Sequence, residues 1–223
     1  LASDPDADRF GCAVPHPLNG WHAEPKALAL TGNQIGAILC HYILDERKTR
    51  GLLPKRGLVC ETVVTTDLVG VIARSFGLDV LDNLLIGFKY IGATIDAMPE
   101  DMTFIFGTEE SHGYLADSDI RDKEAATGVL LVECAAVLKS QGKTLRDYLD
   151  EIYRKYGYFQ QVQTSTYRKG AEGSLEIAAI MDGLRDNPPR SIGGRDVVEV
   201  IDRQTGIATR LSTGETRNVD GDR

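Results

Sequence analysis

Apolar side chains recur along this chain with two different periods, and the alternation between the periods predicts the fold class. Thr31 and Gln34 form a capping-box pair, which is typical of a helix N-terminus. The apolar residues that follow have the helical spacing i, i+3, i+4, i+7 and i+8; they are Ile35, Ile38, Leu39, Tyr42 and Ile43. Next comes a β-branched stretch at 57–66, which predicts a buried strand.

The same alternation continues as far as Gly157. Thr66 is predicted to cap a helix that ends at Gly77, and Thr144, with Asp147 as its capping-box partner, is predicted to cap the last helix. Between these two caps we expect strands over 78–85 and 102–107 and helices over 87–98 and 122–140. Alternating strands and helices favour an α/β fold, with a three-layer α-β-α domain and a mostly parallel mixed sheet.

The chain after this domain has a different pattern. Residues 164–173 look like a linker, a helix is then predicted up to "NPP" at 187–189, and the remainder reads as short strands around turns. So few residues bury little apolar surface by themselves. We therefore expect a partial α+β domain at this end.

Charge and cysteine content narrow the classes of partner. The net charge of −8 argues against nucleic acid or an anionic membrane surface as the main partner, because both attract clusters of Lys and Arg. A run of about 18 apolar residues, as a membrane span requires, does not occur. The four cysteines form no CxxC pair, which favours buried reduced thiols and a cytoplasmic setting.

The stretch "SDPDADR" at 3–9 places acids on every second residue, at Asp4, Asp6 and Asp8. Such a set suits a hard divalent cation, whereas the simpler alternative is a solvated acidic turn. An EF-hand loop starting at Asp4 would need glycine and glutamate where this chain has Arg9 and Pro15, so that motif is excluded. A haloacid-dehalogenase-type phosphatase would have Thr or Val in place of Asp8. Mg²⁺ with an open place for a phosphate oxygen fits better.

The segment "GTEESHGY" at 107–114 follows a predicted buried strand. Ligands of open α/β sheets bind beyond the carboxyl ends of strands, so its polar residues suit a polyhydroxylated ligand; they are Glu109, Glu110, Ser111 and His112. A polar loop that caps the next helix is the alternative. His112 alone indicates a packing or orienting residue rather than a base. Single cations nearby, at Lys89, Arg121 and Lys123, are weak signals.

In sequence order, "DPDADR", "TGNQIGAIL", "GFKYIG", "GTEESHGY" and "SDIRDKEA" resemble the phosphoglucomutase/phosphomannomutase (α-D-phosphohexomutase) family. The "EESHGY" version resembles the phosphoglucomutase and phosphopentomutase-like branch most. This resemblance implies that residues 1–18 are the end of domain 2 with its metal-binding loop. By the same comparison, 19–165 form the sugar-binding domain 3, and 166–223 begin an incomplete domain 4.

The resemblance also implies an activity, a cofactor and a site. Family members are Mg²⁺-dependent phosphotransferases that interconvert sugar 1-phosphates and sugar 6-phosphates, glucose above all, through a phosphoserine and a glucose 1,6-bisphosphate-type intermediate. Three residues would bind Mg²⁺: Asp4, Asp6 and Asp8. Five would contact the hexose or pentose phosphate, with Glu109 and Ser111 on the sugar hydroxyls: Arg9, Lys89, Glu109, Ser111 and Lys123.

The chain departs from the family pattern in three places. Ile86 stands where members often have Thr, which leaves glucose, mannose and pentose phosphates open as substrates. The phosphorylated Ser-His-Asn-Pro-type loop is absent, and "RLSTGET" at 210–216 lacks the proline and spacing of the family's phosphate loop. We therefore expect a fragment that is inactive without the missing domains of the same polypeptide. A non-catalytic module that binds sugar phosphates or a partner is the alternative.

Overall fold

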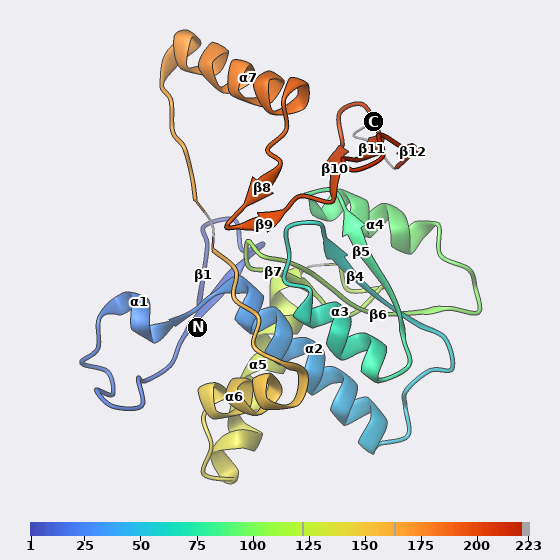
Figure 1. Cartoon of the computed structure of the whole chain (residues 1–223). Coiled ribbons are helices and arrows are strands. Elements are labelled where there is room, and N and C mark those ends of the chain that lie inside the picture. The colour runs from blue at the N-terminus through green and yellow to red at the C-terminus, as the bar shows by residue number, and fades with distance from the viewer. Residues whose placement is uncertain (122, 163, 220–223) are drawn as a thin grey trace. The chain divides into compact units, whose positions relative to one another are not determined.

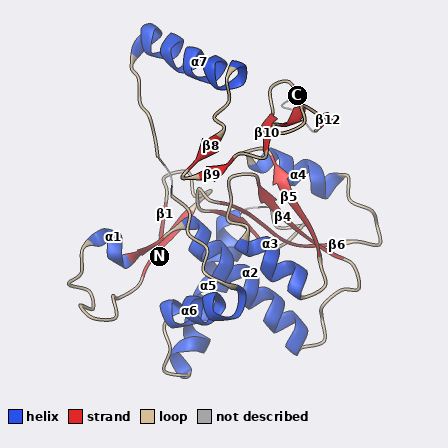
Figure 2. Cartoon of the chain, in the orientation of Figure 1, coloured by secondary structure: helices blue, strands red, loops and turns tan. Residues whose placement is uncertain are grey.

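The computed structural model describes residues 1–121, 123–162 and 164–219, and the side chains of 123–125 lie outside this description. The chain divides into two compact units, Leu1–Gln161 and Val162–Arg223. Each unit has its own elements, which Figure 1 labels along the chain and Figure 2 colours by type. Within the described residues, no helix is long and apolar enough to cross a bilayer.

A four-stranded sheet organises the first unit, in the order β5-β4-β6-β7. Its strands are β4 (Gly57–Thr62), β5 (Asp79–Leu84), β6 (Thr103–Glu109) and β7 (Gly113–Leu115). The β4 strand pairs in parallel with β5 and β6, while β7 turns back antiparallel to β6. The predicted mostly parallel mixed sheet is therefore confirmed.

Helices cover both faces of this sheet (Figure 1). Four of them contact one another on one face: α2 (Gly32–Thr49), α3 (Leu68–Ser75), α5 (Lys123–Ser140) and α6 (Leu145–Tyr156). On the other face lies α4 (Phe88–Asp96). Alternate residues of β4 serve the two layers, because Val59 packs in the four-helix core while Leu58 and Cys60 pack with Ile91 of α4. The three-layer prediction is confirmed.

Two of the three predicted helix caps are present. Thr31 accepts a hydrogen bond from the Gln34 N–H and completes a capping box at the start of α2. Thr144 and Asp147 form a second box at the start of α6. The third prediction is wrong by one residue, because Asp67 is the N-cap of α3, although Thr66 Oγ1 still accepts the Leu68 N–H at 3.4 Å.

The N-terminal region forms a small antiparallel sheet beside the main one. Its strands are β1 (Ala2–Ser3), β2 (Phe10–Ala13) and β3 (Ala29–Leu30), in that order. Between β2 and β3 lie an isolated bridge between His16 and Gly20 and the short helix α1 (Pro25–Leu28). The acidic stretch therefore occupies the tip of the β1–β2 hairpin.

The described residues of the second unit form one helix and short strands, which confirms the α+β prediction. Its elements are α7 (Gly170–Asp186), β8 (Ser191–Ile192), β9 (Arg195–Asp196), β10 (Glu199–Asp202), β11 (Ile207–Arg210) and β12 (Thr216–Asn218). Residues 170–173, predicted as the end of a linker, instead form the first turn of α7. Gly170 begins it with a φ of 72°, a conformation that glycine adopts at little cost.

Strand boundaries also differ from prediction at the edge that carries the polar segments. The β4 strand ends at Thr62 rather than at residue 66, and β6 continues to Glu109 rather than ending at 107. The short β7 strand was not predicted. Three residues are too few to show a period of two, and β7 exists because Gly107–Glu109 supply its pairing partners.

Candidate functional site

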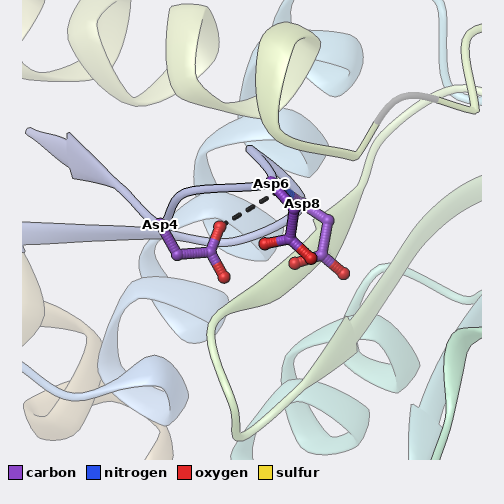
Figure 3. A group of neighbouring side chains, drawn as sticks. All are labelled: Asp4, Asp6 and Asp8. Atoms are coloured by element: carbon purple, nitrogen blue, oxygen red, sulfur yellow. Dashed lines mark hydrogen bonds between the residues drawn. The ribbon is translucent and has the colours of Figure 1, made fainter.

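The three acids of the β1–β2 hairpin converge at its tip. One carboxylate oxygen from each of Asp4, Asp6 and Asp8 lies within 4.8 Å of the others. Figure 3 shows the three side chains together, with Asp4 and Asp8 half-buried and Asp6 exposed. We call residues 4–9 the acidic loop. Its donors are carboxylate oxygens, the type that Mg²⁺ prefers.

Hydrogen bonds inside the acidic loop bring these carboxylates together. Asp4 Oδ1 accepts the backbone N–H groups of Asp8 at 3.2 Å and of Arg9 at 3.1 Å. The Asp4 carbonyl oxygen accepts the Ala7 N–H at 3.1 Å. Ala7 has a φ of 54°, which is unusual for a residue with a side chain and marks the tightest point of the turn. The loop coils because Asp4 binds its backbone on two sides.

Arg9 supplies positive charge within the acidic loop. Its Nε lies 2.7 Å from Asp4 Oδ2 and 3.4 Å from Asp8 Oδ1, and its side chain is 52% exposed. Partial desolvation acts to raise the pKa of Asp4, but the hydrogen bonds and charge of Arg9 together lower that pKa below its usual range. Asp4 therefore remains ionised at neutral pH, and the exposed guanidinium stays charged beside it.

The second polar segment is a tight turn between β6 and β7, formed by residues 110–112. Glu109 ends β6 and is only 6% exposed. Its Oε1 accepts the Gly87 N–H at 2.6 Å, and Gly87 is the N-cap residue of α4, with a φ of 125°. Ser111 is half-buried within the turn. The 110–112 turn is thus tied through Glu109 to the start of α4.

The acidic loop and the 110–112 turn are neighbours. Phe10, directly after the acidic loop, donates its N–H to the His112 carbonyl oxygen at 3.4 Å. His112 has a φ of 70°, a strained conformation for a residue with a side chain. The fold therefore places two segments that are about a hundred positions apart in sequence beside each other at the carboxyl end of β6.

The predicted cations have different surroundings. Lys89 is exposed in the first turn of α4, with its Nζ 4.8 Å from the Tyr90 ring centroid. Arg121 forms an ion pair with Asp96 at 2.7 Å, so it joins the segment before α5 to the end of α4. Lys123 begins α5, and its side chain lies outside the described part of the chain.

The structure thus brings together most of the predicted residues, but not all. The acidic loop and the segment around the 110–112 turn come together and contain Asp4, Asp6, Asp8, Arg9, Glu109 and Ser111. Lys89 belongs to α4, and Gly87 at the start of this helix donates its N–H to Glu109. The side chain of Lys123 lies outside the described residues.

One residue that shapes this site, Gly32, escaped the sequence reasoning. Gly32 approaches the 110–112 turn so closely that a Cβ there would lie 2.0 Å from the Glu110 carbonyl oxygen. Glu110 Oε2 is buried without a hydrogen-bond partner among the described residues. The glycine directly after the Thr31 cap was the available signal, since a helix needs no glycine in its first turn.

Comparisons with known proteins agree with the resemblance found in the sequence. The family model "Phosphoglucomutase/phosphomannomutase, alpha/beta/alpha domain III" matches residues 31–156. A phosphoglucomutase of Staphylococcus haemolyticus is 37% identical over 92% of this chain and 36% of its own length. A phosphoglucomutase of Staphylococcus aureus is 33% identical over 99% of this chain and 38% of its own length.

A solved structure shares the fold. The open form of pp63/parafusin, a phosphoglucomutase from Paramecium, matches with a TM-score of 0.54 at 16% identity, over 97% of this chain and 34% of that one. The chain therefore spans little more than a third of the length of these relatives.

Proposed function

The chain belongs to the phosphoglucomutase/phosphomannomutase family, and from this membership we propose that it supplies the metal-binding loop and the sugar-binding domain of a phosphohexomutase. The proposed reaction interconverts a sugar 1-phosphate and a sugar 6-phosphate, with glucose as the first candidate sugar. The observation that carries the proposal is the convergence of Asp4, Asp6 and Asp8 beside the 110–112 turn. Because the chain covers only part of its relatives' length, the activity is proposed for the whole protein.

The acidic loop fits Mg²⁺. Its three carboxylates offer the hard oxygen donors that this ion selects. Because the loop coils, one oxygen from each carboxylate lies within 4.8 Å of the others. Asp4, Asp6 and Asp8 would hold the ion. Bound there, Mg²⁺ would offset negative charge on a phosphoryl group, which is the main need in phosphoryl transfer.

The other residues have roles in binding and orientation. The exposed Arg9 guanidinium is placed to bind a phosphate oxygen, since a planar fork with several donors suits that group. Glu109 and Ser111 offer an acceptor and a hydroxyl to the sugar, and Lys89 and Lys123 add positive charge toward its phosphate. A carboxylate with two acceptor oxygens suits either orientation of a bisphosphate, as an exchange of the two ends requires.

The nucleophile in this proposal comes from another part of the whole protein. A phosphoserine there gives its phosphoryl group to the sugar phosphate, the bisphosphate turns over, and the second phosphate returns to the serine. We assign residues 1–18 to the end of domain 2, 19–165 to domain 3 and 166–223 to the start of domain 4. The isolated 223-residue chain is then expected to be inactive.

Turnover of the whole protein tests the proposal. Purified whole protein, primed with glucose 1,6-bisphosphate, is given glucose 1-phosphate with and without Mg²⁺, and glucose 6-phosphate is measured. We expect Mg²⁺-dependent conversion of glucose 1-phosphate. Mannose and pentose phosphates are assayed in the same way, because the sequence leaves them open as substrates. No turnover on any of the three sugar classes would contradict the proposal and leave a non-catalytic binding module.

A further inference from the structure

Tyr114 connects three segments around the candidate site. It is 1% exposed in β7, and its hydroxyl donates to the Gly32 carbonyl oxygen at 3.3 Å. Its ring packs against the Phe10 ring, with centroids 4.9 Å apart and planes tilted by 54°. Its carbonyl oxygen accepts the Thr127 hydroxyl of α5 at 3.4 Å. One buried side chain therefore contacts the N-terminus of α2 and the strand that leaves the acidic loop.

Gly32 lies directly against the backbone of the 110–112 turn. A Cβ at this position would lie 2.0 Å from the Glu110 carbonyl oxygen and 2.9 Å from the His112 nitrogen. Both are backbone atoms, so no side-chain rotation relieves such a clash. The α2 N-terminus can therefore approach the turn at this distance only because residue 32 is glycine.

These contacts link the turn to two elements. Gly32 of α2 lies directly against the backbone of the turn, and Phe10 of β2 donates its N–H to the His112 carbonyl oxygen. His112 has a φ of 70°, and a strained backbone of this kind persists where the surroundings leave no alternative. The close approach of Gly32 and the hydrogen bond from Phe10 thus fix the relative position of the acidic loop and the turn.

We propose that Gly32 and Tyr114 are positioning residues, which align the acidic loop with the sugar-binding turn. The inference rests on the proposed function, because alignment matters only if one substrate meets both segments. Group transfer is sensitive to placement, and an error of about 1 Å costs on the order of 100-fold in rate. Neither residue is assigned contact with the substrate; they act through Phe10 and the backbone of the turn.

Amide hydrogen exchange in the 223-residue chain tests the alignment without any ligand. Gly32→Ala is expected to accelerate exchange of the Phe10 amide at least tenfold, and Tyr114→Phe about threefold, while the Val59 amide in β4 keeps its wild-type rate. Two controls match the chemical changes elsewhere. Gly128→Ala lies in α5, where a Cβ meets open space, and Tyr148→Phe removes a hydroxyl bonded to His41.

Kinetics of the whole protein test the consequence. For Gly32→Ala we expect kcat to fall about 100-fold, with KM changed less than threefold. For Tyr114→Phe we expect kcat to fall about fivefold. The controls Gly128→Ala and Tyr148→Phe should keep the wild-type kcat and KM. An unchanged Phe10 exchange rate, or faster exchange with unchanged kcat, would overturn the inference. If Gly32→Ala does not fold, Tyr114→Phe decides. A wild-type protein without turnover would refute the proposed function, whereas the exchange rates would still decide whether these residues hold the two segments together.

Discussion

The acidic loop and the 110–112 turn are neighbours, but different forces hold them. The turn follows a buried strand, and its flanking carboxylate, Glu109, is 6% exposed and accepts a backbone N–H from Gly87. The acidic loop has an exposed Asp6 and is shaped mainly by hydrogen bonds from its own backbone to Asp4. Tertiary contacts therefore hold the turn in place, whereas local hydrogen bonds within residues 4–9 shape the acidic loop.

This difference bears on how each segment would respond to a ligand. Three carboxylates repel one another, and Arg9 offsets only part of their charge, so the acidic loop keeps an excess of negative charge at its surface. A bound cation would relieve that repulsion. Beside the 110–112 turn, by contrast, the buried Glu109 carboxylate already accepts the Gly87 N–H, so a ligand would meet a preformed surface.

The largest expected effect is a loss of activity, without a loss of stability, when an acid of the loop is neutralised. Asp6→Asn should lower kcat/KM of the whole protein at least 100-fold, about 3 kcal/mol of transition-state stabilisation, and weaken its Mg²⁺ dependence. The melting temperature of the chain should not fall, because Asp6 is exposed. Asp79→Asn is the matched control, since Asp79 is an exposed acid at the start of β5. Equal activity of the two variants would contradict the metal assignment.

Glu61 contrasts with the exposed acids of the loop, because it shows how much folding free energy is lost when a carboxylate is buried without a full set of hydrogen bonds. It is 2% exposed, and its Oε2 has no partner among the described residues. Burial, followed by the charges of Asp82 and Asp67, raises the pKa of Glu61 to about 8.

The sign of the pH dependence follows from this shift. The folded state holds the Glu61 proton up to about pH 8, whereas the unfolded chain releases it near the ordinary value of 4.5, so stability falls as pH rises between the two. Glu61→Gln should remove this loss and gain on the order of 2 kcal/mol at pH 7, but almost nothing at pH 4. Urea unfolding at both pH values measures it. An equal gain at both would refute the assignment.

Removal of a carboxylate should cost stability beside the turn but not in the loop. Glu109→Ala leaves the Gly87 N–H without its acceptor, which we expect to cost about 2 kcal/mol in the free energy of unfolding. Asp6→Ala should stay within about 0.5 kcal/mol of the wild type. Urea denaturation of the chain compares the two. Similar losses would show that the fold supports the loop as much as the turn.

The smallest effect concerns the ion pair within the acidic loop. Arg9→Gln should raise the pKa of Asp4, because the guanidinium is the main group that lowers it against partial desolvation. Carbon-detected NMR titration of the Asp4 carboxyl measures this change. The free energy of unfolding should hardly change, as for other exposed ion pairs. An Asp4 pKa that does not move would assign its shift to the backbone hydrogen bonds alone.

Local sequence signals predicted most of the fold. Thr31 with Gln34, and Thr144 with Asp147, fixed two helix starts because capping is a property of neighbouring residues. The β7 strand was missed because its pairing depends on β6, and the first turn of α7 because four residues with two glycines resemble a linker.

The candidate site was predictable in its residue types but not in its construction. The alternating acids of the loop indicated a candidate metal site by their spacing. The contact between Gly32 and Glu110, and the hydrogen bond between Phe10 and His112, join residues far apart in the chain. Such contacts arise from tertiary packing, which no local pattern encodes.

Paramagnetic broadening by Mn²⁺ tests most directly the proposal that the acidic loop is a metal site that lies beside the 110–112 turn. Mn²⁺, a substitute for Mg²⁺, is titrated into the ¹⁵N-labelled 223-residue chain, with Asp6→Asn as the control. We predict that the amides of Asp4, of residues 6–9 and of residues 110–112 broaden first, while those of Gly57 and Thr103, at the opposite ends of β4 and β6, stay sharp, and that Asp6→Asn suppresses the effect. Broadening of the loop without the turn, or equal broadening at both ends of the sheet, would contradict the account.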